Sequence, residues 1–154
     1  MLRGPESQPT PRSTTVTAAR FDTKIAVLLR NDLESWQRLN VTAFLSSAVA
    51  GADPGLIGEP YADADGTEYL AMFRQPVLVF TGDAELLTTA HGRALSRGLK
   101  LAVFTEELFS TGNDTDNRAA VAAVPAEKLN LVGIALHGPK NAVDKVIKGA
   151  SLHP

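Results

Sequence analysis

The sequence of 154 residues contains no cysteine, and it has only two methionines, one tryptophan and three histidines. The lack of cysteine excludes disulfides, thiolate metal sites and a cysteine nucleophile. Phosphate-loop and dinucleotide motifs are also missing, so we expect no metal and no cofactor. A net charge of −2 does not give the strongly basic field of a general nucleic-acid binder. No apolar run is long enough for a signal peptide or a membrane span, so we expect a cytoplasmic protein without a membrane partner.

Hydrophobic residues make up 44% of the chain, which is enough to bury one sizeable core. Residues 1–22 are rich in proline, serine and threonine, and Phe21 is their only aromatic side chain. Such a segment buries too little apolar surface to offset the entropy of ordering it. We therefore predict a disordered N-terminal tail over 1–22 and a single α/β domain over 23–154.

Four short apolar segments predict buried strands, and the segments between them predict helices. The helix between the second and third strands can be capped by Asp83 and ended by Gly98, and such a crossover makes these two strands parallel. The strands are apolar throughout, so we expect both faces of the sheet to be covered in an α/β sandwich. The predicted strands are 24–30, 77–81, 99–104 and 130–136, and the other predicted helices cover 36–50, 116–124 and the segment between Pro139 and Gly149.

The remaining segments give more local predictions. Residues 56–70 are typical of a hairpin that turns at 63–66 and adds an edge to the sheet. We expect His91 at the boundary of an apolar helix face and His153 in a frayed terminus. His137 follows a strand and precedes a helix, where its imidazole could meet a bound anion or cap the element.

Polar side chains follow the predicted strands, at the carboxyl ends where open α/β sheets bind ligands. Arg30 and Asp32 follow the first strand and Glu106 follows the third. Together with hydroxyls and amides from the next loop, they could bind a polar ligand or transfer a proton. The alternative is that Asn113 and Asp114 only cap a helix, while Arg30 pairs with a nearby acid on the surface. Both interpretations stay open.

Five stretches of the chain have a recognisable pattern: KIAVLLRNDLESWQRLNVTAFL (24–45), GEPYADADGTEYL (58–70), RQPVLVF (74–80), TEELFSTGNDTDNRAAV (105–121) and LVGIALHGPKNAVDKVIKG (131–149). With them the chain resembles the bacterial family catalogued as domain of unknown function 2000 (DUF2000). That family is similar in fold to the type 2 peptidyl-tRNA hydrolases, which are three-layer α/β/α sandwiches with a mixed sheet of about four strands and commonly dimerise. The resemblance implies this fold and a homodimer.

The resemblance to the hydrolases is weakest at their active site. Those enzymes follow the first strand with a G-K-G-K loop and an A-x-Q helix, which supply an active-site lysine and glutamine. Here Phe44 stands in the glutamine's place, and Arg38 could replace the lysine's charge but not act as a proton-transfer base. Because the lysine and glutamine are missing, we do not expect peptidyl-tRNA hydrolysis itself. The polar residues at the carboxyl ends of the strands instead predict a polar-ligand pocket there, as in a diverged hydrolase or transferase.

Two hypotheses from different classes follow. An enzyme would use the candidate catalytic residues Arg38, Glu106 and Asp114. A non-catalytic module would bind RNA or a protein partner, with Trp36 stacking on a base or filling a pocket. RNA binding would also require basic residues of several segments, such as Arg38 and Lys145, to gather on one face. The candidate ligand-binding residues are Arg30, Asp32, Trp36, Asn40, Thr111, Asn113 and His137.

Overall fold

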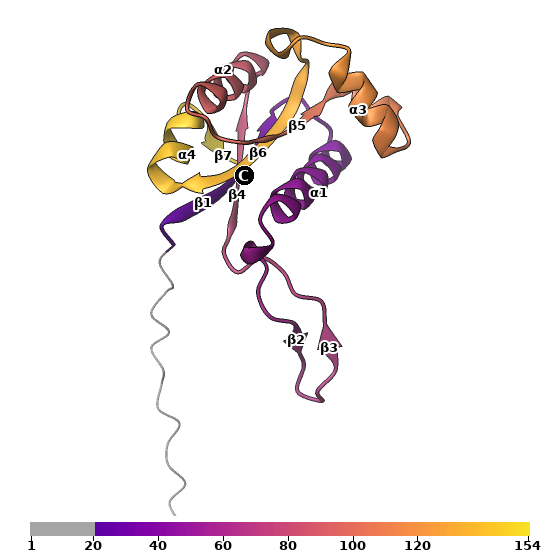
Figure 1. The fold of residues 1–154 in the computed structure, drawn as a ribbon, viewed down its shortest axis with the longest axis vertical. Coiled ribbons are helices and arrows are strands. Elements are labelled where there is room, and N and C mark those ends of the chain that lie inside the picture. Colours follow the sequence, from indigo (N-terminus) through magenta and orange to yellow (C-terminus); the bar gives the residue numbers. More distant parts are fainter. Residues whose placement is uncertain (1–20) are drawn as a thin grey trace, which may run out of the picture.

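A computed structural model describes residues 21–154 and has a five-stranded mixed sheet between two layers of helices (Figure 1). The strand order is β5-β6-β1-β4-β7. β4 runs parallel to β1, and β6 runs antiparallel to both β1 and β5, so β1, β4 and β5 end at the same edge. The tail predicted over 1–22 lies largely outside the described residues. The strands of this sheet are β1 (Thr23–Arg30), β4 (Val77–Gly82), β5 (Ala102–Thr105), β6 (Leu131–Pro139) and β7 (Ser151–Leu152).

The helices form the outer layers and confirm the predicted α/β sandwich. α1 packs against β6, β1 and β5 on one face of the sheet, whereas α2 and α4 pack on the opposite face. The buried side chains accordingly form two cores, one on each side of the sheet. The helices are α1 (Ser35–Ala52), α2 (Ala84–Ser96), α3 (Asp114–Ala122) and α4 (Lys140–Val146), with three short 3₁₀ helices, η1 (Pro54–Leu56), η2 (Glu106–Ser110) and η3 (Ala126–Lys128).

Local signals in the sequence fix where the crossover helix α2 begins and ends. The Asp83 carboxylate accepts a hydrogen bond of 2.8 Å from the Leu86 N–H, which satisfies one of the free donors in the first turn. Gly98 ends the helix with a φ of +68°, in the left-handed region that glycine enters without steric cost. Both residues therefore have the roles that the sequence predicts. Within the described residues, no helix combines the length and apolar character that a membrane crossing requires.

The last residues of the chain form the edge strand β7, which the sequence did not predict. Leu152 and Ser151 pair with Phe80 and Thr81 of β4, and the His153 N–H donates to the Val79 carbonyl over 2.9 Å. The expected fraying of His153 is therefore wrong. A two-residue strand has no periodicity of its own, so only its pairing with β4 defines it.

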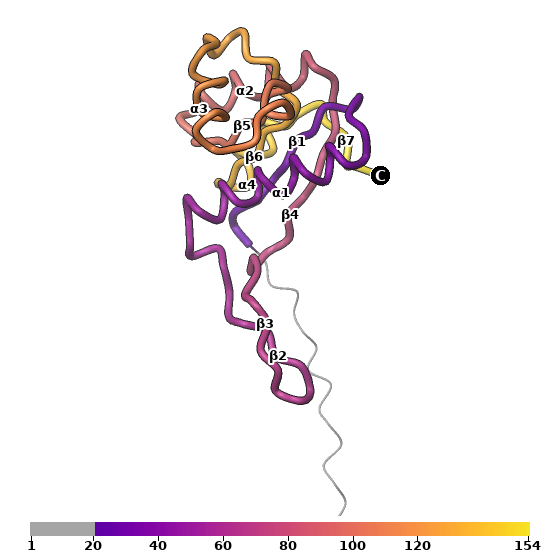
Figure 2. The backbone as a smooth tube through the Cα atoms, turned by 90° about the vertical axis from the view of Figure 1, so that its right-hand side faces the viewer, coloured from indigo at the N-terminus to yellow at the C-terminus, as the bar shows by residue number. Residues whose placement is uncertain are grey.

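The hairpin predicted over 56–70 forms but does not extend the sheet. Its strands, β2 (Tyr61–Ala62) and β3 (Glu68–Tyr69), make a separate two-stranded sheet that projects from the body of the protein (Figure 2). Asp63 organises the turn, since its carboxylate accepts from the Thr67 N–H and from the Tyr69 hydroxyl. The hydrogen bond from Tyr69, with smaller contributions from backbone donors, lowers the pKa of Asp63. The edges of the main sheet are formed by β5 and β7 instead.

His91 is only 7% exposed on α2, so it is buried rather than at a boundary. Burial lowers its pKa, because a charged imidazole is poorly solvated there. The unfolded chain then binds more protons than the folded one at mildly acidic pH. The stability that neutral His91 gives the folded protein is therefore fully present above its ordinary pKa of about 6.5. This stability is lost as the pH falls through the lower pKa that His91 has in the folded protein.

We therefore expect acid to destabilise the native protein more than a His91→Leu variant. The loss of melting temperature between about pH 7.5 and about pH 5.5 should be smaller in the variant, because leucine has no proton to gain. Thermal unfolding of both proteins at the two pH values measures the difference. Equal losses would contradict the assignment of this pH dependence to His91.

Candidate functional site

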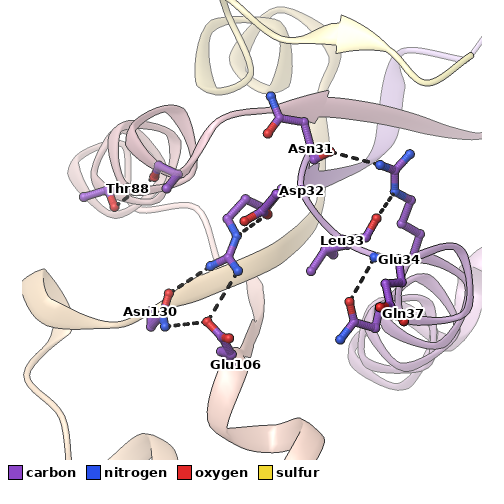
Figure 3. A network of polar contacts seen from close by, with 11 residues as sticks. Asn31, Asp32, Leu33, Glu34, Gln37, Thr88, Glu106 and Asn130 are labelled. Atoms are coloured by element: carbon purple, nitrogen blue, oxygen red, sulfur yellow. Dashed lines mark hydrogen bonds and ion pairs between the residues drawn. The ribbon is translucent and has the colours of Figure 1, made fainter.

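Arg30 gathers polar side chains at the carboxyl edge of β1 and β5. Its Nε donates to the Asp32 carboxylate over 2.6 Å, Nη1 donates to the Asn130 Oδ1 over 2.9 Å, and Nη2 lies 3.4 Å from the Glu106 carboxylate. The Asn130 amide also donates to Glu106 over 2.8 Å, which closes the network (Figure 3). Three predicted residues, Arg30, Asp32 and Glu106, are thus brought together.

The Arg30 network contains one cation and two carboxylates, those of Asp32 and Glu106. Burial alone would lower the pKa of Arg30, but hydrogen bonds and attraction from Asp32, and then from Glu106, outweigh it and raise the pKa. Two carboxylates therefore neutralise the Arg30 guanidinium without any ligand. Arg30 thus pairs with nearby acids, which is the alternative to ligand binding that the sequence left open.

Arg38, on the first turns of α1, has a different kind of environment. Its Nε donates to the Leu33 carbonyl and its Nη2 to the Asn31 carbonyl, both over 2.9 Å (Figure 3). Its Nη1 lies 3.2 Å from the His153 Nε2. Among residues 21–154, no carboxylate comes within 4.0 Å of the Arg38 guanidinium. Arg38 is thus a half-buried cation with neutral partners only.

The hydrogen-bonding capacity of Arg38 is not exhausted by these contacts. Arginine has only donors, so the His153 Nε2 accepts from it, which places the imidazole proton on Nδ1. The Nδ1 of His153 lies 2.9 Å from the main-chain oxygen of Pro154, which accepts the proton that this tautomer carries. The three contacts use three of the five N–H groups of the guanidinium and leave one on each terminal nitrogen. Two such donors match the two oxygens of a carboxylate.

A groove of about 730 Å³ runs between α1 and β4, and we call it the α1–β4 groove. It exists because α1 packs against β6, β1 and β5 and leaves the same face of β4 open. Although the sequence predicts that both faces of every strand are covered, all six residues of β4 are only half-buried. The groove is lined by Arg38 and Leu39 of α1, Val77 and Val79 of β4, and Leu152 and His153 of the C-terminal segment.

Other predicted residues of α1 lie outside this groove. Trp36 is 56% exposed, its Nε1 donates to the Glu34 carboxylate over 2.7 Å, and its ring meets the Phe109 ring edge-on at 5.7 Å. Asn40 is exposed on the same helix. The exposure of Trp36 leaves its indole accessible to a partner.

Each of the predicted residues near the start of α3 is engaged by a neighbour in the same segment. The Thr111 hydroxyl donates to the Leu108 carbonyl over 2.9 Å. The Asn113 side chain caps α3 by accepting from the Asp116 N–H over 2.9 Å. Asp114 forms an ion pair with Arg118 one turn later. Asn113 thus has the capping role of the alternative interpretation, whereas Asp114 forms an ion pair instead. Within the described structure, Asp114 makes no hydrogen bond or ion pair with Arg38 or Glu106.

His137 is on the wrong side of the molecule to join the predicted site. Because β6 is antiparallel to β1, His137 pairs with Ile25 near the start of β1, at the edge opposite Arg30. Its Nδ1 lies 3.9 Å from the Asp53 carboxylate, and its Nε2 is buried without a hydrogen-bond partner in the described structure. His137 therefore lies apart from the other candidate ligand-binding residues.

The sequence analysis missed Asn130 and His153. Asn130 directly precedes β6, so the antiparallel orientation of β6 would have placed it beside Arg30, while His153 reaches Arg38 only through β7. Across residues 21–154, no three His, Asp or Glu side chains are grouped so as to hold a metal ion.

Comparisons with known proteins agree with this fold. The family model described as protein of unknown function (DUF2000) matches residues 23–154. A solved structure of a protein of unknown function from Agrobacterium tumefaciens strain C58, Atu0240, is 44% identical to this chain, with a TM-score of 0.86. That similarity covers 88% of this chain and 100% of the other. A comparison with curated proteins finds no match. The chain described here therefore belongs to the DUF2000 family.

Proposed function

We propose that this protein binds a small organic anion at the carboxyl edge of its parallel strands, with Arg38 as the residue that holds the anionic group. One observation carries the proposal: Arg38 contacts only neutral acceptors, whereas Arg30 is neutralised by Asp32 and Glu106. Taking a charge out of water is costly unless an opposite charge compensates it. An anion in the α1–β4 groove would supply that charge.

Binding, rather than catalysis, fits the residues around Arg38. The candidate catalytic carboxylates are committed elsewhere, Glu106 to Arg30 and Asp114 to Arg118. His153 is the titratable side chain in contact with Arg38, and its Nε2 already accepts from the guanidinium. A diverged hydrolase or transferase would need a general base or nucleophile poised over the groove, and neither of these two carboxylates has that position.

The arrangement of basic residues favours a small ligand over RNA. Arg38 lies on α1, on one face of the sheet, whereas Lys140 and Lys145 belong to α4 on the opposite face. A nucleic-acid backbone needs several cations along one surface. A protein partner is the second candidate, favoured by the exposed Trp36, which lies outside the α1–β4 groove.

Titration of the ¹⁵N-labelled protein with hexanoate and with hexyl phosphate tests the anion site. We expect binding to shift the amide signals of Asn31, Leu33 and His153, and Arg38→Gln to weaken it by about 10- to 100-fold. This range corresponds to a hydrogen-bonded charge pair of about 1.5–3 kcal/mol. Arg97→Gln is the matched control, because Arg97 is exposed at the end of α2 on the other face.

Two results would contradict the anion site. One is the absence of binding by either anion at millimolar concentration. The other is an Arg38→Gln variant that folds normally and binds as tightly as the native protein.

A further inference from the structure

We infer that the ligand held by Arg38 is an amphipathic monoanion, a carboxylate joined to an unbranched apolar tail, and that the tail lies in the α1–β4 groove. This inference rests on the proposed function, because it takes Arg38 as the site of the anionic group. It adds the chemical class of the ligand, which the anion site alone does not define.

The walls of the α1–β4 groove are apolar and open to solvent. Leu39 of α1 is 74% exposed and forms one wall of the groove. Val77 and Val79 of β4, both half-buried, form its floor. Exposed apolar side chains that are scattered singly need no explanation, but Leu39 lies with these two valines on one concave surface beside a cation. An apolar group in the groove would remove them from water.

The polar side chains in the α1–β4 groove are Arg38, His153 and three hydroxyls, and those of Ser35 and Ser46 make no hydrogen bond within the described residues. The Thr42 hydroxyl donates to the Arg38 carbonyl over 2.7 Å, within the helix. His153 is engaged with Arg38 and with the Pro154 carbonyl. A sugar or a nucleobase would therefore find few partners for its own hydrogen-bonding groups, and their desolvation would oppose binding. An alkyl tail has no such groups.

The size and direction of the groove suit a linear tail. Its volume of about 730 Å³ is within the range of small-molecule sites. Arg38, Thr42 and Ser46 all line it, and their spacing covers about 12 Å along the helix axis. Arg38 is at the end nearest the carboxyl edge of the sheet, so a tail anchored there extends toward Val77. One cation with two free N–H groups matches a singly charged carboxylate.

Calorimetric titration with butyrate, hexanoate and octanoate, each below its aggregation concentration, tests the tail. We expect affinity to rise about three- to fourfold with every added methylene, the gain that burial of one CH₂ gives. 1-Octanol, which has the same tail length but no charge, should bind at least tenfold more weakly than octanoate. Arg38→Gln should weaken every carboxylate by a similar factor.

Variants of the groove wall separate the tail from the head. Leu39→Ser should reduce the affinity for octanoate severalfold and leave that for butyrate unchanged. Leu39 is largely exposed, so this change should not unfold the protein. Leu95→Ser, at a half-exposed leucine of α2 on the opposite face, should change neither affinity.

The outcomes that overturn the two proposals differ. If all three carboxylates bind equally and Arg38→Gln still weakens them, the apolar tail is wrong and the anion site stands. Affinity could instead rise with tail length while the Arg38→Gln variant binds as tightly as the native protein and 1-octanol binds as tightly as octanoate. In that case the anion site is wrong. If Leu39→Ser and Leu95→Ser act alike, the tail does not lie in the α1–β4 groove.

Discussion

Replacing Leu45 by alanine is expected to lower the free energy of unfolding by about 2–5 kcal/mol. Leu45 is 2% exposed and lies in the core between α1 and the sheet. The change removes buried methyl groups and leaves a cavity that the rigid strands of the sheet cannot fill. In a domain of this size each kcal/mol lowers the melting temperature by about 2–4 °C, so the shift is easily seen in thermal unfolding.

Leu95→Ala is the matched control for this truncation. Leu95 is about half exposed on α2, so its loss should change the stability by no more than about 0.5 kcal/mol. If Leu45→Ala proved as mild as Leu95→Ala, α1 would not be packed on the sheet as described.

The second large effect is expected at Gly133, in the middle of β6. A Cβ atom there would lie 2.6 Å from Val41 Cγ1, 3.0 Å from Leu45 Cδ1 and 3.3 Å from Leu29 Cδ2. Gly133→Ala should therefore cost about 1–3 kcal/mol in unfolding free energy, because added volume in a packed core forces side chains off their rotamers. Urea unfolding of the variant measures the cost.

A double-mutant cycle tests whether this cost is steric. Val41→Ala removes the Val41 methyl group closest to the added Cβ, so Gly133→Ala should be less destabilising in that background than in the native protein. A coupling of about 0.5–3 kcal/mol is expected for residues in contact. Strict additivity of the two changes would show that Gly133 is needed for another reason than the approach of α1.

Signals that act over a few residues made much of the fold predictable. Asp83 caps the start of α2 and Gly98 ends it, as their capping chemistry predicts, and Asn113 caps α3. Four strands were predicted from their apolar segments. The edge strand β7 was not, because only its pairing with β4 defines it. The similarity in fold to the peptidyl-tRNA hydrolases and the homodimer both remain predictions.

The candidate site was predictable only where strand direction was known. Arg30, Asp32 and Glu106 meet because β1 and β5 end at one edge. His137 does not lie with them, because β6 runs the other way and its carboxyl end is at the opposite edge. The α1–β4 groove depends on where α1 lies across the sheet, which no local pattern of the sequence specifies.

The position of β6 also determines when the sheet can form during synthesis. β6 is an interior strand that pairs with β1 on one side and β5 on the other, yet it is made after both. β5 joins the sheet only through β6. A nascent chain that has not yet exposed β6 therefore has β1 and β5 with no strand to link them. Because such distant pairings form slowly, this protein should complete its sheet only once nearly the whole chain has left the ribosome.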